Sequence, residues 1–216
     1  ILHGLDRFVH GFLHQVRRLL NFPSLSSINK PSSWRGEELF AGEDWEWRFV
    51  DEELEELKLL CALDKQVHEP IGSELLKKKL GSIEDSLENG SGAVILRGFP
   101  LDSFESEFGA EKISELFLWL ASQVGTPVSQ NATGDLMLNV RNEAFGKDDV
   151  RTRGPNTNRK LSFHTDRCDV IAFLCIRQAM EGGENELVSS PALYESIRKE
   201  RPDLLNILMQ PFPYKR

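Results

Sequence analysis

A histidine and an aspartate two positions apart are the residues of this chain best suited to metal chemistry. His164 and Asp166 belong to the segment 161–166, Leu-Ser-Phe-His-Thr-Asp. If the segment is extended, both side chains leave the same face, because strand side chains alternate with a period of two. Two histidines and one carboxylate on one face of an octahedron form the site of non-haem Fe(II) oxygenases, and this pair would supply two of those ligands. The alternative is an exposed, hydrogen-bonded pair on a loop.

The composition is that of an ordinary soluble globular chain and argues against several classes of protein. The 216 residues are 40% hydrophobic and 28% charged, which suits one domain with a substantial core. A net charge of −8 argues against a nucleic-acid binder, and no apolar run is long enough to span a membrane. The three cysteines, Cys61, Cys168 and Cys175, make no disulfide framework and indicate a reducing, intracellular compartment. We favour buried, hydrophobic cysteines over thiolate ligands near the His-x-Asp pair.

The first thirty residues differ from the rest of the chain. Residues 1–20 are basic, contain one acid and place hydrophobic residues at helical spacing, which predicts an amphipathic helix. Such a start resembles an organelle targeting segment, which would place the protein in the mitochondrial matrix rather than the cytoplasm. The alternative is a surface helix that packs on the domain. Residues 21–33 are rich in Ser, Pro and Asn and indicate a linker. We therefore expect an N-terminal segment with linker over 1–30 and a domain over 31–216.

The rest of the chain predicts a mixed order of helices and strands. Helices are expected at 51–63, 74–80, 82–87, 110–124, 190–199 and 202–210. Strands are expected at 92–100, 135–141, 170–176 and 186–189. We expect a solvated face for the acids of the 51–63 helix, a half-buried 135–141 strand and a 170–176 strand buried on both faces. The long polar stretch 142–160, which leads into His164, is typical of a functional lid or a disordered segment.

Seven short segments follow one another in an order that is more specific than any of them alone. They are 31–36 (PSSWRG), 92–98 (GAVILRG), 125–131 (GTPVSQN), 134–136 (GDL), 161–166 (LSFHTD), 182–185 (GGEN) and 201–205 (RPDLL). Together they resemble the TauD/TfdA family of Fe(II)- and 2-oxoglutarate-dependent dioxygenases, in particular its clavaminate-synthase-like members. The resemblance covers about residues 31–212 and includes the His-x-Asp segment.

The resemblance implies an α+β fold whose core is a double-stranded β-helix, a jelly-roll or cupin-like barrel, with flanking α-helices. It implies an enzyme that uses O2 to hydroxylate or oxidatively cleave a small organic substrate, with Fe(II) as cofactor and 2-oxoglutarate as cosubstrate, and that releases succinate and CO2. His164 and Asp166 would be the catalytic metal ligands. Asn185 stands where the family usually has a Thr or Ser that contacts 2-oxoglutarate, and an amide can also donate that hydrogen bond.

Three further residues are candidates for contact with the substrate. Arg141 and Asn139 face away from the apolar side of their predicted strand, and the alternative is a solvated strand face. Gln130 follows Pro127, and the alternative there is ordinary turn chemistry.

Two parts of the family pattern are missing from this sequence. The family's second metal-binding histidine and its 2-oxoglutarate-binding arginine come later in the chain, yet no histidine follows His164. The residues of these types that do not match the family positions are His3, His10, His14, His68, Arg167, Arg177, Arg198, Arg201 and Arg216. We therefore expect the N-terminal portion of an oxygenase domain, whose incomplete barrel would leave strand edges that favour a homo-oligomer. The alternative is a catalytically inactive binding or scaffold protein without the full metal site.

Overall fold

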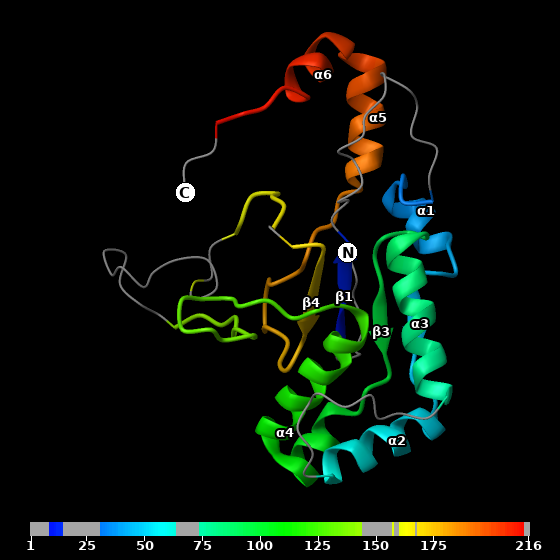
Figure 1. Cartoon of the computed structure of the whole chain (residues 1–216), viewed down its shortest axis with the longest axis vertical. Coiled ribbons are helices and arrows are strands. Elements are labelled where there is room, and N and C mark those ends of the chain that lie inside the picture. Colours follow the sequence, from blue (N-terminus) through cyan, green and yellow to red (C-terminus); the bar gives the residue numbers. More distant parts are fainter. Residues whose placement is uncertain are drawn as a thin grey trace.

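The computed structural model describes residues 9–14, 31–63, 74–143, 157, 160–166 and 168–213 (Figure 1). In chain order the elements are β1 Val9–His14, α1 Gly36–Ala41, β2 Glu46–Arg48, α2 Asp51–Ala62, α3 Glu74–Glu88, β3 Ile95–Arg97, α4 Leu101–Val124, β4 Val170–Leu174, α5 Ser190–Glu200 and α6 Pro202–Leu208. None of the helices in these described ranges is both long and apolar enough to cross a membrane.

Four strands form one sheet in the order β2-β3-β1-β4. β2 is parallel to β3, with Trp47 opposite Leu96, and β1 lies antiparallel between β3 and β4. The helix predicted over residues 1–20 is therefore wrong at 9–14, where the chain is a strand. In the sheet this segment gains backbone hydrogen bonds on both sides, and Gly11 weakens the helical alternative.

The described strands do not form the expected double-stranded β-helix, although their mixture with helices fits the α+β class. Two predicted strands, 135–141 and 186–189, are irregular. In the first of them Leu136, Leu138 and Val140 are 40%, 46% and 66% exposed, so the alternating pattern does not bury one face. A strand depends on hydrogen bonds to a neighbouring strand, and no described strand pairs with either segment.

The strand predicted to be buried on both faces is β4, and this prediction is wrong in its burial. Phe173 of β4 is 37% exposed, and the other β4 side chains are half-buried. The reason lies in the packing, because Val170, Ala172 and Leu174 contact the hydrophobic core, whereas the alternate residues Ile171 and Phe173 are not part of it.

The central helices confirm the predicted segments but not all of their ends. α3 is one continuous helix through Gly81, where two short helices were predicted. α4 begins at Leu101 rather than Ala110 and changes direction at Gly109, whose φ of 84° glycine adopts without steric cost. The first half of α4 was missed because this glycine interrupts the helical pattern of the sequence.

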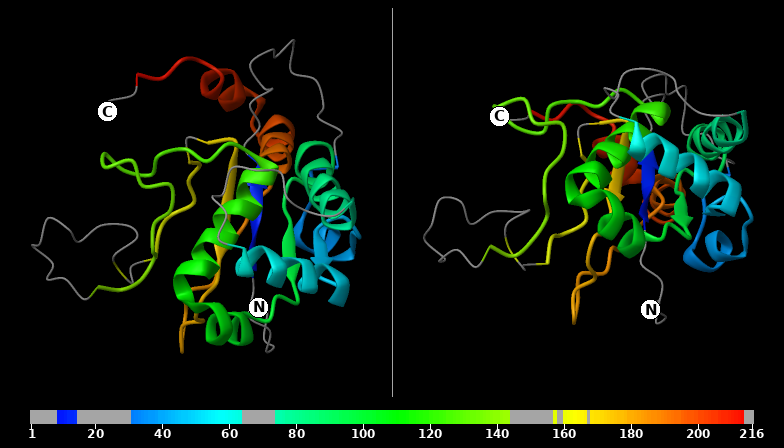
Figure 2. Two further views of the ribbon diagram at one scale, coloured as in Figure 1. Left: turned by 60° about the horizontal axis from the view of Figure 1, so that its bottom comes forward. Right: turned by 90° about the horizontal axis from the view of Figure 1, so that it is seen from below.

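The hydrophobic core lies where α2, α3 and α4 pack against one another beside the sheet (Figures 1 and 2). Leu57, Leu76, Ile83 and Phe104, which come from all three helices, are fully buried. The ring centroids of Phe99 and Phe104 lie 4.7 Å apart, which is a favourable aromatic contact. This core fixes β3, and through β3 it fixes the sheet that carries β4.

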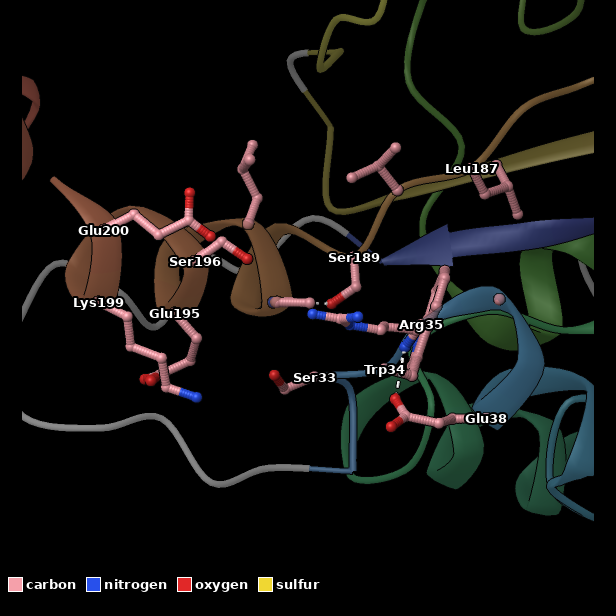
Figure 3. Close-up of a pocket in the computed structure, with 14 residues that line it drawn as sticks. Ser33, Trp34, Arg35, Glu38, Leu187, Ser189, Glu195, Ser196, Lys199 and Glu200 are labelled. Carbon is pink, nitrogen blue, oxygen red and sulfur yellow. Dashed lines mark hydrogen bonds between the residues drawn. The ribbon is translucent and has the colours of Figure 1, made fainter.

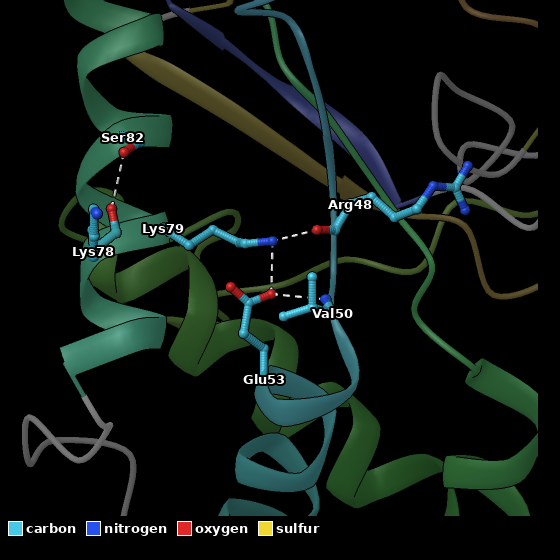
Figure 4. A network of polar contacts seen from close by, with 6 residues as sticks. All are labelled: Arg48, Val50, Glu53, Lys78, Lys79 and Ser82. Atoms are coloured by element: carbon cyan, nitrogen blue, oxygen red, sulfur yellow. Dashed lines mark hydrogen bonds and ion pairs between the residues drawn. The ribbon is translucent and has the colours of Figure 1, made fainter.

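One acidic residue of α2 is buried, which corrects the prediction that these acids form a solvated face. Glu53 is 2% exposed, and its carboxylate accepts a hydrogen bond from the Val50 amide at 3.0 Å. The same carboxylate pairs with Lys79 Nζ of α3 at 2.6 Å, and Lys79 also donates to the Arg48 carbonyl (Figure 4). The network joins α2, α3 and the end of β2.

A second polar cluster joins the chain before α1 to the turn after α3. Trp34 Nε1 donates to the Ser91 carbonyl at 2.8 Å, and the Ser91 amide donates to Asp44 Oδ2 at 2.8 Å. The backbone passes so close here that a Cβ on Gly90 would lie 2.4 Å from Asp44 Oδ2 and 2.8 Å from the Ser86 carbonyl oxygen. Glycine is thus required at position 90.

Candidate metal site

His164 and Asp166 lie close together on the irregular segment that leads into β4. Their side chains are 54% and 52% exposed, and the distance from His164 Nε2 to Asp166 Oδ1 is 3.8 Å. Two metal–ligand bonds of about 2.1 Å can span about 4.2 Å, so a single ion can contact both atoms. The structure therefore brings the two predicted ligands together, although their segment is not part of a strand.

The other ring nitrogen of His164 is already occupied. Nδ1 lies 2.8 Å from the Ser162 carbonyl oxygen. A carbonyl can only accept, so Nδ1 carries the proton in this contact and the lone pair of the neutral ring is on Nε2, the atom that faces Asp166. Metal-binding histidines commonly have this arrangement, in which one nitrogen donates to a backbone carbonyl and the other binds the ion. The residues present fit a divalent metal.

The Ser162 contact was not predicted from the sequence. A backbone carbonyl is present at every position, so no residue type marks it as a partner. Only the conformation of residues 162–164 decides that this carbonyl meets the imidazole ring.

Two ion pairs tie the neighbourhood of the site to other segments. Lys160 Nζ lies 2.9 Å from Glu186 Oε2, which connects the chain just before the metal segment to the chain just after Asn185. Arg177, which follows β4, pairs with Glu105 of α4 at 2.5 Å. The side chains of Lys160, Glu186 and Arg177 are more than half exposed, so each pair contributes no more than about 1 kcal/mol.

The remaining predicted site residues are exposed. Arg141 pairs with Glu143 at 2.5 Å, and Gln130 Nε2 donates to the Val128 carbonyl at 2.9 Å. No hydrogen bond among the described residues joins these side chains, or those of Asn139 and Asn185, to His164 or Asp166. Their roles toward substrate and 2-oxoglutarate remain predictions.

The segment that contains Gln130 folds into a tight polar turn. Asn131 Oδ1 accepts hydrogen bonds from the backbone amides of Thr133 and Asp135, at 3.1 and 3.0 Å. Hydrogen bonds from the Asn131 amide and the Thr133 hydroxyl lower the pKa of Asp135. These contacts are the ordinary turn chemistry that was the alternative reading of this segment.

Several residues considered in the sequence analysis lie outside the described part of the chain. They are His3, His68, Arg167, Arg216 and most of the polar stretch 142–160, together with the side chains of His10 and His14. Within the described residues no group of three or more His, Cys, Asp or Glu side chains could hold a metal. His164 and Asp166 are therefore two candidate ligands, and the described residues add no third to them.

The two cysteines near the His-x-Asp pair, Cys168 and Cys175, are only half-buried, although the sequence predicts buried cysteines there. All three are free, and Cys61 lies in the core at 6% exposure. Burial raises the pKa of the Cys61 thiol to about 11. Burial, followed by the charges of Asp166 and Asp169, also raises the pKa of Cys168. Raised pKa values disfavour the thiolate form that binds metals.

Comparisons with known proteins agree with these observations. The family model described as "Taurine catabolism dioxygenase TauD, TfdA family" matches residues 64–216, which include the metal pair. "FR-33289 synthase" of Streptomyces rubellomurinus (strain ATCC 31215) is 33% identical over 131 residues, covering 60% of this chain and 38% of that protein. "Taurine hydroxylase-like protein SAT17" of Stachybotrys chartarum (strain CBS 109288 / IBT 7711) is 26% identical over 142 residues, covering 62% of this chain and 36% of that protein. The chain spans well under half the length of these curated relatives.

Proposed function

Because the chain belongs to the taurine catabolism dioxygenase TauD, TfdA family, we propose that it supplies two metal ligands of an Fe(II)- and 2-oxoglutarate-dependent dioxygenase. The substrate in this proposal is a small organic molecule, which is hydroxylated or oxidatively cleaved with O2 while 2-oxoglutarate yields succinate and CO2. The observation that carries the proposal is the His164–Asp166 pair, whose facing atoms lie 3.8 Å apart.

The two side chains have separate roles in holding the metal. His164 would bind through Nε2, and the Ser162 carbonyl holds the ring in the tautomer that leaves this atom free. Asp166 would bind through its carboxylate, which adds a negative charge that favours a divalent cation. When bound, Fe(II) supplies the site at which O2 and the cosubstrate react, and two protein ligands leave positions open for them and for a further ligand.

The cosubstrate contact is proposed at Asn185. Its amide would donate a hydrogen bond to 2-oxoglutarate. The Lys160–Glu186 ion pair supports this proposal, because it connects the chain beside Asn185 to the chain that leads into His164. Arg141, Asn139 and Gln130 remain the proposed substrate contacts, and Arg141 would have to leave Glu143 to reach a ligand.

We also propose that residues 31–216 form the oxygenase domain, with 1–30 as a separate N-terminal part. β1 would then add a strand from that part to the sheet of the domain. An intracellular location and a homo-oligomer are further parts of this proposal.

The test is anaerobic addition of Fe(II) and 2-oxoglutarate to the full-length protein. We expect the weak visible absorption band of an iron–2-oxoglutarate chelate, and succinate release once O2 and a substrate are present. His164→Ala and Asp166→Asn should each abolish the band. Asp203→Asn is the matched control, because Asp203 forms an exposed ion pair with Arg201 far along the chain in α6, and it should retain the band.

Absence of iron binding by the full-length protein would refute the proposal. The chain would then be a binding or scaffold protein that keeps the family fold. Iron binding that survives His164→Ala would instead show that the metal lies elsewhere.

A further inference from the structure

The chain leaves α3 through Asn89 and Gly90, a pair of residues that is chemically labile in an unfolded chain. The backbone nitrogen of the glycine can attack Cγ of the asparagine side chain, because no glycine side chain hinders the approach. That nitrogen gives up its proton to a base in solution, the new C–N bond closes a succinimide ring, and the side-chain amide nitrogen leaves as ammonia. Water then opens the ring to aspartate or isoaspartate. The reaction consumes only water, so the conformation of the turn decides whether it occurs.

Both reacting groups of this pair are held by Asp85, one turn earlier in α3. Asn89 Nδ2 donates to Asp85 Oδ1 at 2.7 Å. The Gly90 amide, which is the nucleophile of the reaction, donates to the Asp85 carbonyl at 3.2 Å, and the Asn89 amide donates to the same carbonyl at 2.8 Å. Asn89 is exposed to solvent, so burial does not protect it. Its protection comes from these hydrogen bonds, because attack would turn the Gly90 nitrogen away from the carbonyl.

The packing around Gly90 opposes the same rotation. A Cβ on Gly90 would overlap Asp44 Oδ2 and the Ser86 carbonyl oxygen, so the peptide before Gly90 has little room to turn. The next residue is held on both sides, since the Ser91 amide donates to Asp44 Oδ2 at 2.8 Å and the Ser91 carbonyl accepts from Trp34 Nε1 at 2.8 Å. Trp34 belongs to the chain that leads into α1 (Figure 3). Rotation before Gly90 therefore requires contacts between distant segments to open.

We propose that Asn89 is a modification site that the folded turn keeps closed and that deamidates when the contacts of Asp44 and Trp34 with Ser91 open. The inference rests on the turn alone and does not depend on the proposed oxygenase function.

The modification acts in one direction, because its products do not fit the turn. Aspartate at position 89 would place a carboxylate where the Asn89 amide now donates to Asp85, so two carboxylates would face each other. Isoaspartate would add a CH2 group to the backbone beside Gly90, where the structure has no room for a methyl group. A chain that has opened and reacted is thus less able to close the turn again.

The experiment compares the deamidation rate of the folded wild-type chain with that of the same chain unfolded in urea, at one mildly alkaline pH. Peptide mass spectrometry follows the conversion of amide to acid at position 89 and separates aspartate from isoaspartate. We expect the folded chain to react at least about tenfold more slowly, because reaction waits for local opening. Asn89→Gln should abolish the signal at this position.

A variant that opens the turn without unfolding the chain tests the named contacts. Asp44→Ala removes the acceptor of the Ser91 amide and should raise the Asn89 rate of the folded protein by about tenfold. Trp34→Phe keeps an aromatic ring but loses the Nε1 donor, and it should raise the rate by a smaller factor. Asp203→Ala is the matched control, because it breaks an exposed ion pair in α6 and should leave the rate unchanged. Thermal melting verifies that each variant is folded.

Two results would overturn the proposal. One is a folded wild-type chain that deamidates at Asn89 within about tenfold of its rate in urea, which decides the matter even where Asp44→Ala does not fold. The other is a folded Asp44→Ala protein whose rate equals that of the wild type.

Discussion

Replacing Lys79 with methionine should destabilise the fold more than any other single loss of charge among the described ion pairs. The substitution removes the ammonium from a pair in which the Lys79 side chain is 11% exposed and the Glu53 side chain 3%. Methionine keeps an unbranched apolar chain of similar length, so little packing is lost. Glu53 keeps its hydrogen bond from the Val50 amide but loses the ammonium group that lies 2.6 Å from its carboxylate.

The magnitude follows from the burial of the carboxylate that remains. Breaking a buried pair by removing one partner costs about 3–5 kcal/mol, because an uncompensated charge stays in the interior. The substitution also ends the hydrogen bond to the Arg48 carbonyl and the contact of Nζ with the Phe49 ring, whose centroid is 5.7 Å away. We expect the free energy of unfolding to fall by about 3–4 kcal/mol.

The assay is urea denaturation followed by circular dichroism, with a double-mutant cycle. Glu53→Gln keeps an acceptor for the Val50 amide and should cost less than Lys79→Met, because Lys79 can still donate to the Arg48 carbonyl. The double variant should be more stable than the sum of the single losses by about 1–3 kcal/mol. Lys78→Met is the matched control, since its exposed side chain lies next to Lys79 on α3 (Figure 4), and it should change stability by less than about 0.5 kcal/mol.

Two results would refute this reasoning. One is a loss below about 1 kcal/mol for Lys79→Met, the value of an exposed pair. The other is strict additivity in the cycle, which would show that Glu53 and Lys79 act independently.

Three further predictions concern the turn after α3, the core thiol and the metal pair. Gly90→Ala should destabilise the fold by about 1–3 kcal/mol, because the new methyl group meets Asp44 and backbone atoms. Gly81→Ala in α3 is the control: nothing lies within 4 Å of the added Cβ, so this substitution should be neutral or stabilise the helix. Thermal melting compares the two variants. Cys61 should stay unmodified in a thiol-labelling experiment at pH 8. Because the pKa of the folded-state thiol is raised, the neutral Cys61 stabilises the fold fully below the unfolded-state pKa of about 8.5, and this contribution is lost as the pH rises toward 11. Urea denaturation should show this loss as a fall in the free energy of unfolding over that pH range, and Cys61→Val should lack this part of the fall. Residues 1–216 alone should bind Fe(II) weakly, because the described chain gathers two ligands, and a tight one-to-one complex in calorimetry would contradict this.

The sequence by itself determined the features that depend on neighbouring residues. The pair of ligands was predicted because His164 and Asp166 are two positions apart, and such a short spacing limits how far the side chains can separate. The helices α2, α5 and α6 were predicted with ends within a few residues of the observed ones, because their hydrophobic spacing and proline positions act locally. The family resemblance also followed from the order of short segments.

The tertiary structure alone decided the features that depend on distant partners. Residues 9–14 became a strand because β3 and β4 lie on either side of them, and 135–141 did not because no described strand pairs with them. The burial of Glu53 required Lys79, a residue from another helix. The hydrogen bond from the Ser189 hydroxyl to the Ser32 carbonyl joins two segments that lie far apart in the chain. Hydrogen bonds and burial between such distant residues leave no local pattern in the sequence. The two-residue spacing of His164 and Asp166, in contrast, is visible in the sequence itself.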